Sequence, residues 1–142
     1  MIKIEQLMNV TTKAVEEMNF LLPQLSKNAK PLSYASLLDV IKDPATTLLV
    51  VKDGAKIVGM GTLLVFHNPV GKWASLQDIV IDEAYRGQGL GEKLSKHMIE
   101  LARGHKVGGI ELTSKPDRIV AHKLYEKLGF EKKETNVYRL RL

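Results

Sequence analysis

The chain has 142 residues, 44% of them hydrophobic, and a formal net charge of +5. This length and composition predict a single globular domain, residues 1–142, with a substantial core. The absence of cysteine excludes disulfides, thiolate nucleophiles and cysteine-ligated metals. The sequence has no apolar run of transmembrane length and no signal-peptide pattern at residues 1–7, so we expect a cytoplasmic protein without a membrane partner.

The positive charge fits a well-solvated surface and would also attract a polyanionic cofactor. The lysines and arginines are scattered, and no aromatic-rich strand or recognition helix stands out, so nucleic-acid binding is not expected. The histidines, at positions 67, 97, 105 and 122, lack metal-ligand spacing, and the sequence therefore predicts no metal site.

The N-terminal half predicts one strand, two helices and a hairpin. In chain order these are a strand at residues 2–7, a helix at 12–22 that Pro23 ends or kinks, a second helix capped by Ser33 and stopped at Asp43-Pro44, and strands at 46–51 and 55–66. Gly59 and Gly61 interrupt the second strand of the hairpin, which indicates a bulge or the close approach of another group.

The C-terminal half predicts alternating strands and helices. In order these are a strand at 73–82, a glycine-rich turn, a helix ending near Arg103, a strand at 109–113, a helix that begins at Pro116-Asp117 with Asp117 as its candidate N-cap and stops at Gly129, and final strands at 130–135 and 137–142. Residues 76–113 then form a right-handed crossover with a parallel strand pair. The whole order predicts a mixed α/β sheet with helices on both faces.

The turn that follows the strand at 73–82 has the features of a phosphate site. Ile79, Val80 and Ile81 form a β-branched run typical of a buried strand, and the turn comprises Arg86, Gly87, Gln88, Gly89, Leu90 and Gly91. The first N–H groups of the next helix lack internal partners, and its dipole adds positive charge there. The glycines let the backbone approach a bulky anion, and an arginine can bind phosphate oxygens in bidentate fashion. The glycine spacing does not fit the dinucleotide fingerprint, and the P-loop pattern is absent.

Two segments resemble motifs of the GCN5-related N-acetyltransferase (GNAT) family. Residues 86–91 fit R-x-x-G-x-G and resemble motif A, [QR]-x-x-G-x-[GA], which holds the pyrophosphate of acetyl-CoA; residues 121–130 resemble motif B, A-x-x-x-Y-x-x-x-G-F. The resemblance implies the GNAT fold, in which the parallel strands, here 76–82 and 109–113, splay into a V. It also implies acetyl-CoA as co-substrate, with the pantetheine arm pairing with the backbone of Ile79–Ile81. In the N-terminal half the likeness rests only on the order of elements.

Tyr125 is the candidate general acid for acetyl transfer to a primary amine in a ternary complex. It occupies the position of the motif B tyrosine, which in the family protonates the departing thiolate. A thiol pKa is roughly 8.5 and a phenol pKa about 10, so this proton transfer is close to balanced. A core tyrosine with its hydroxyl at the surface is the structural alternative. A CoA-binding sensor or interaction module without catalysis is the alternative function.

The general base is left open between Asp78, Glu83 and water. Strand alternation puts Asp78 on the same face as Leu76 and Val80, where it is either buried or in the cleft, and desolvation would raise its pKa. A structural hydrogen-bond acceptor is the other interpretation of Asp78. Residues 77–87 also resemble E-D-I-V-V-D-x-x-Y-R-G of the glucosamine-6-phosphate acetyltransferases, with Gln77 in place of the first acid.

Two residues of the last helix are further candidates for cofactor contact. Arg118 stands where motif B often carries Asn, so one hydrogen bond to pantetheine is in doubt, and its guanidinium would face the CoA phosphates or solvent. His122, next to Ala121, would flank the cofactor or be solvated. The acceptor, a small-molecule or peptide amine, carries no motif. The last strand is an exposed-edge candidate, and pairing of such edges could give a homodimer.

Overall fold

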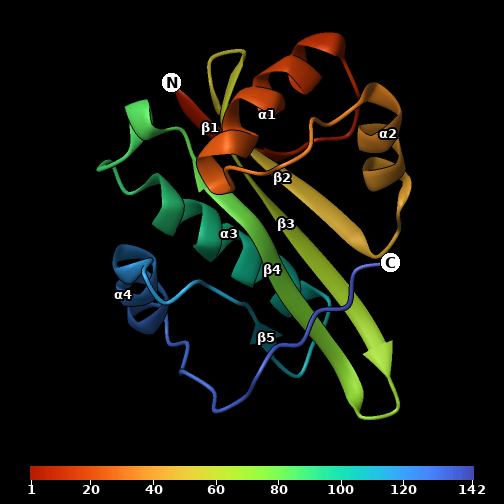
Figure 1. Cartoon of the computed structure of the whole chain (residues 1–142), viewed down its shortest axis with the longest axis vertical. Coiled ribbons are helices and arrows are strands. Elements are labelled where there is room, and N and C mark those ends of the chain that lie inside the picture. Colours follow the sequence, from red (N-terminus) through yellow and green to blue (C-terminus); the bar gives the residue numbers. More distant parts are fainter.

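The computed structural model describes residues 1–142 as one mixed sheet with helices on both faces (Figure 1). The strands lie in the order β1-β2-β3-β4-β5; β1 to β4 are antiparallel, and β4 pairs with β5 in parallel. The elements are β1 (Ile2–Gln6), α1 (Thr12–Leu25), α2 (Tyr34–Lys42), β2 (Thr46–Asp53), β3 (Lys56–Asn68), β4 (Gly71–Ile81), the 3-10 turn η1 (Glu83–Tyr85), α3 (Leu90–Gly104), β5 (Ile110–Glu111) and α4 (Ile119–Lys127). The predicted fold class is confirmed. No helix has the length and apolar character needed to cross a bilayer.

The sheet separates two hydrophobic clusters. On one face α3 contributes Leu94 and Met98, and on the other face α1 and α2 contribute Leu21 and Leu37. The inner strand β2 is buried on both faces of the sheet: its successive side chains point to opposite faces, and both faces are covered. Its Leu49 and Val51 lie in the α3 cluster, while Leu48 and Val50 lie in the α1/α2 cluster.

The predicted helix starts in the N-terminal half are confirmed, but one predicted end is wrong. The Ser33 hydroxyl accepts a hydrogen bond from the Ser36 amide at 3.0 Å and caps α2 as expected. Pro23 does not end α1, which runs on to Leu25. A proline removes only its own N–H from the helix, and the following amides still find partners, as Ser26 does at the Leu22 carbonyl, 3.0 Å away.

A bulge in β4 corrects the expected strand alternation. Gln77 pairs with Thr62 and Val80 pairs with Met60, so Asp78 and Ile79 together oppose the single residue Gly61. Asp78 takes the left-handed conformation, with φ at +54°. The extra residue shifts the alternation by one, so that side chains after the bulge point to the opposite faces from those expected. The expectation that Leu76 and Val80 share a face is therefore wrong: Leu76 belongs to the α3 cluster and Val80 to the α1/α2 cluster.

The strand glycines mark close approaches, as predicted. A Cβ on Gly61 would lie 2.9 Å from the sulfur of Met98, and a Cβ on Gly59 would lie 2.7 Å from Cδ1 of Ile81. Both distances are shorter than a carbon contact allows. The glycine at position 61 therefore lets α3 lie against the sheet where β4 bulges.

The end of the chain departs from the prediction. Residues 130–142 form neither of the two expected strands, and the side chains of Val137, Tyr138 and Leu140 are 73%, 90% and 85% exposed. An alternating pattern makes a segment suited to a strand, but the ladder hydrogen bonds must come from a neighbour. Here β5 is only two residues long, and Lys133 of the tail forms an ion pair with Glu111 of β5, at 3.4 Å.

Helix α4 begins one residue later than expected and stops as expected. Its N-cap is Arg118, which makes no capping hydrogen bond, so Asp117 is wrong as the N-cap. Gly129 has φ at +98°, and the amides of Gly129 and Phe130 donate to the carbonyls of Glu126 and Tyr125. This pair of bonds is the glycine-ended stop that the sequence predicts.

Candidate active site

The parallel strands β4 and β5 are joined at one end and open at the other. Only Ala74 and Ser75 pair with β5, and from Leu76 to Ile81 β4 has no strand partner on that side. Gly109 lies at the paired end of β4 and β5, with its backbone directly against the ring of Trp73. Any Cβ at this position would overlap the ring, so the close approach requires glycine. The gap opens toward Ile79–Ile81, the segment that the sequence analysis assigned to pantetheine pairing.

The glycine-rich turn forms a nest of free donors at the start of α3. Gly87 and Gly89 have φ at +81° and +76°, and a Cβ at either position would meet nothing within 4 Å. The backbone N–H groups of Gly87 through Glu92 donate to no carbonyl or side-chain oxygen. Such a row of donors at a helix N-terminus binds anions, and phosphate above all.

Other turn residues have different environments. Arg86 is exposed, and its Nε donates to the carbonyl of Ile81 at 3.0 Å, which leaves the terminal guanidinium nitrogens for an anion. Gln88 is exposed. The Leu90 side chain is buried, so only its amide faces the turn. Gly91 lies under α4, with its Cβ position 3.8 Å from Cδ2 of Leu124.

Side chains from distant parts of the chain hold the turn that leads into the nest. Gln24 of α1 accepts a hydrogen bond from the Glu83 amide at 2.8 Å and donates to Oδ1 of Asp82 at 3.3 Å. The Tyr85 hydroxyl donates to Oδ2 of Asp53 at 2.7 Å, which raises the pKa of Tyr85 and lowers that of Asp53. The roles of Gln24 and Asp53 were not predicted from the sequence. Gln24 is 58 residues from Asp82 and Asp53 is 32 residues from Tyr85, and no local pattern links positions so far apart.

Tyr125 lies on α4, which is tied to the first turn of α3. Lys127 contacts Glu92 at 3.1 Å and is the larger cause of the lowered pKa of Glu92, ahead of Lys96. Tyr125 is half-buried, and its ring meets that of Phe130 edge-on with centroids 5.9 Å apart. Burial raises the pKa of Tyr125, so the phenol keeps its proton, and the charge of Arg118 acts weakly in the opposite direction.

The other site residues predicted from the sequence lie on β4, on η1 and at the start of α4. Asp78 is exposed at the bulge, which excludes the buried environment that the sequence analysis allowed. Glu83 is exposed in η1 and contributes its amide to the bond with Gln24. Arg118 is exposed at the start of α4, and His122 is half-buried one turn later. No group of three or more His, Asp or Glu side chains is arranged to hold a metal ion.

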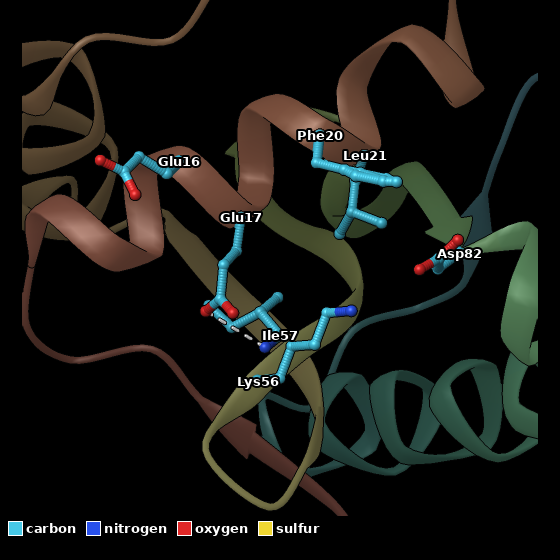
Figure 2. Close-up of a pocket in the computed structure, with 7 residues that line it drawn as sticks. All are labelled: Glu16, Glu17, Phe20, Leu21, Lys56, Ile57 and Asp82. Carbon is cyan, nitrogen blue, oxygen red and sulfur yellow. Dashed lines mark hydrogen bonds between the residues drawn. The ribbon is translucent and has the colours of Figure 1, made fainter.

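A separate hollow of about 240 Å³ lies between α1 and the start of β3 (Figure 2). Its lining residues are Glu16, Glu17, Phe20, Leu21, Lys56, Ile57 and Asp82. The Ile57 amide donates to Oε1 of Glu17 at 3.3 Å across it. The hollow contains none of the residues proposed from the sequence, and Asp82 is its link to the turn before the nest.

A splayed parallel pair beside a nest of free donors is the arrangement expected of an acyl-CoA-dependent transferase. The family model for the acetyltransferase (GNAT) family matches residues 13–130, and the chain belongs to this family. Among curated proteins, it is 30% identical over 95 residues to glucosamine 6-phosphate N-acetyltransferase 1 of Oryza sativa subsp. japonica, covering 63% of this chain and 56% of that protein. It is 34% identical over 109 residues to mycothiol acetyltransferase of Corynebacterium glutamicum, covering 75% and 35%. The chain thus spans between about a sixth and just over half of the length of the curated relatives that it matches.

Solved structures share the whole fold. A transcriptional regulator from Bacillus halodurans superposes with a TM-score of 0.87 at 25% identity, over 100% of both chains. AAC(6')-Iy, solved with the bisubstrate analogue CoA-S-monomethyl-acetylneamine, superposes with a TM-score of 0.80 at 17% identity, over 100% of this chain and 99% of its own. These likenesses agree with the splayed sheet and the helix order described above.

Proposed function

We propose that the protein is an acetyl-CoA-dependent N-acetyltransferase that transfers the acetyl group to a primary amine by direct attack in a ternary complex. The observation that carries this proposal is the row of free N–H donors from Gly87 to Glu92, placed beside the open end of the β4–β5 pair. Family membership and the names of the relatives support the same chemistry.

The residues present fit acetyl-CoA in two parts. The nest at Gly87–Glu92, with the exposed guanidinium of Arg86, offers donors and positive charge to a pyrophosphate. The backbone of Ile79–Ile81, which has no strand partner on the β5 side, offers an edge on which the pantetheine amides can pair as a further strand would. Arg118, the N-cap of α4, and His122, one turn later, are the residues proposed to contact the rest of the cofactor.

In the reaction, the amine nitrogen forms a bond to the thioester carbonyl carbon and the carbon–sulfur bond breaks. Tyr125 gives its proton to the departing thiolate; burial raises its pKa, so the phenol is protonated throughout the neutral range, and the transfer to a thiolate is correspondingly more uphill. The amine gives up its proton to a base. Holding the two reactants together supplies a large share of the acceleration.

For the base we propose Asp78, because the bulge presents its carboxylate outward beside the open strand edge. Glu83 and water are the alternatives. An Asp78→Asn variant is expected to lower kcat/KM throughout its pH profile, since an amide cannot accept the proton. A profile identical to the parent would eliminate Asp78 and leave Glu83→Gln as the next variant to measure.

The acceptor we propose is a small-molecule or peptide amine. The matched relatives are named as a glucosamine 6-phosphate N-acetyltransferase, a mycothiol acetyltransferase and N-acetylaspartate synthetases, and the solved complex carries an acetylneamine group. The predicted cytoplasmic location and homodimer stay predictions.

The first experiment is calorimetric titration with acetyl-CoA and with CoA, followed by thiol release in the presence of a panel of amines. Saturable 1:1 binding with amine-dependent thiol release is the expected result. Binding without thiol release for any amine would favour the non-catalytic CoA-binding module. Absence of binding to either ligand would reduce residues 86–91 to an ordinary glycine-rich turn.

A further inference from the structure

Two side-chain amides of α1 each make a pair of hydrogen bonds to a segment outside the helix. Asn19 accepts from the Leu32 amide at 2.7 Å and donates to the Leu32 carbonyl at 2.9 Å, which fixes the loop between α1 and α2. Gln24 accepts from the Glu83 amide at 2.8 Å and donates to Oδ1 of Asp82 at 3.3 Å. The two amides are similar in chemistry and share a helix, but only Gln24 reaches the segment that leads into the phosphate nest.

The bonds of Gln24 fall at the point where β4 ends and the chain turns. Asp82 is only 5% exposed, and the same Oδ1 that Gln24 contacts accepts from the Ala84 amide at 3.2 Å, so one carboxylate oxygen links α1 to η1. The first free donor, Gly87, follows Glu83 by four residues. The direction of η1 therefore sets the direction in which the nest points.

A hollow lies beside Asp82, next to the hydrogen bonds that Gln24 makes to Asp82 and Glu83. It separates the middle of α1, at Phe20, from the start of β3 at Lys56 and Ile57 (Figure 2). Leu21 of α1 and Ile57 of β3 still lie in the same buried cluster, and the amide of Gln24 adds a direct polar bridge from α1 to the turn.

We propose that Gln24 is a positioning residue for the CoA phosphate site, acting through Asp82 and Glu83 on the nest at Gly87–Glu92. The inference rests on the proposed function, and it extends that function to a helix on the opposite face of the sheet from α3. Gln24 touches no reacting atom; it holds the donors in the orientation that a pyrophosphate requires, so that less order is lost on binding.

The test compares Gln24→Ala with the matched control Asn19→Ala. Each variant loses two hydrogen bonds from α1 to a backbone segment, so both are expected to lower the melting temperature. Titration with CoA should show about tenfold weaker binding for Gln24→Ala, the effect of roughly one net hydrogen bond, and a change below about twofold for Asn19→Ala. In turnover, Gln24→Ala should raise the KM for acetyl-CoA with little change in kcat.

A charge exchange gives an independent readout. Gln24→Glu removes the donor to Asp82 and places two carboxylates together, so CoA binding should weaken at least as much as in Gln24→Ala. Adding Asp82→Asn removes the repulsion between the two carboxylates and, with its NH2 group in the place of Oδ1, supplies a donor to position 24 while the bond from the Ala84 amide is lost. The double variant should therefore recover part of the lost affinity, which a purely destabilising change would not do.

The outcomes separate this inference from the proposed function. Equal CoA affinity in Gln24→Ala and Asn19→Ala, or no recovery in the Gln24→Glu/Asp82→Asn variant, would overturn the role of Gln24 while CoA binding by the parent protein stands. A parent protein that binds no CoA would overturn the proposed function itself.

Discussion

The nest at Gly87–Glu92 and helix α4, the two parts of the proposed site, are held in place very differently. The turn before the nest is fixed from α1 by Gln24, from the end of β2 by Asp53 and from within by Arg86. Helix α4 has no fully buried residue, and Ile119 and Val120 are 61% and 85% exposed. It is attached mainly through its last turns, and the chain after it forms no strand.

The difference indicates a division of work between cofactor binding and chemistry. A site whose donors are held before the ligand arrives binds with a smaller entropy cost. The tyrosine, in contrast, sits on a helix with few buried contacts, and such elements open at low free-energy cost. We therefore expect changes on α4 to alter turnover and changes in the nest to alter binding, and three variants test that separation.

The largest effect is expected from Tyr125→Phe. Removing the hydroxyl while keeping the ring and its edge contact with Phe130 should lower kcat by about a hundredfold, the scale of a general acid. CoA affinity, measured by titration, should stay close to that of the parent. Unchanged turnover would end the assignment of Tyr125 as the acid, and a parallel loss of CoA affinity would contradict the division between the two regions.

A smaller effect, on binding alone, is expected from Gly89→Ala. The Cβ meets no neighbour, so the cost is the left-handed backbone at φ +76°, about 1–2 kcal/mol for a residue other than glycine. If the backbone relaxes, the donors turn away, and CoA affinity should fall by about tenfold. Gly104→Ala, at the end of α3 with equally open space and no positive φ, is the matched control and should bind CoA as the parent does.

The smallest effect is a shift in pH dependence from Arg118→Ala. The positive charge of Arg118 lowers the pKa of Tyr125 against the larger effect of burial, so its removal should raise that pKa. A general acid works while protonated, and the alkaline limb of kcat should therefore move to higher pH. Lys123→Ala, an exposed cation on the same helix, is the control and should leave the limb in place. A shift to lower pH in Arg118→Ala would contradict the assignment.

Local patterns were sufficient for the parts of the site that lie within one stretch of chain. The nest glycines, the helix after them, the stop at Gly129 and the position of Tyr125 on a helix follow from spacing within about ten residues. The same kind of reasoning failed at Asp78, because a bulge does not interrupt the apolar alternation that predicts a strand. It failed also at residues 130–142, where the pattern suits a strand but no neighbour supplies the ladder bonds.

The sequence by itself determined the order of elements from β1 to α4, the mixed sheet and the glycine-rich turn, because capping, glycine conformation and hydrophobic period act between residues close in the chain. Only the tertiary structure decided which side chains support that turn, since Gln24 and Asp53 meet it across separations that no local pattern records. It also decided the face on which each β4 residue lies, because the two core clusters and the bulge opposite Gly61 are properties of neighbouring strands and helices together.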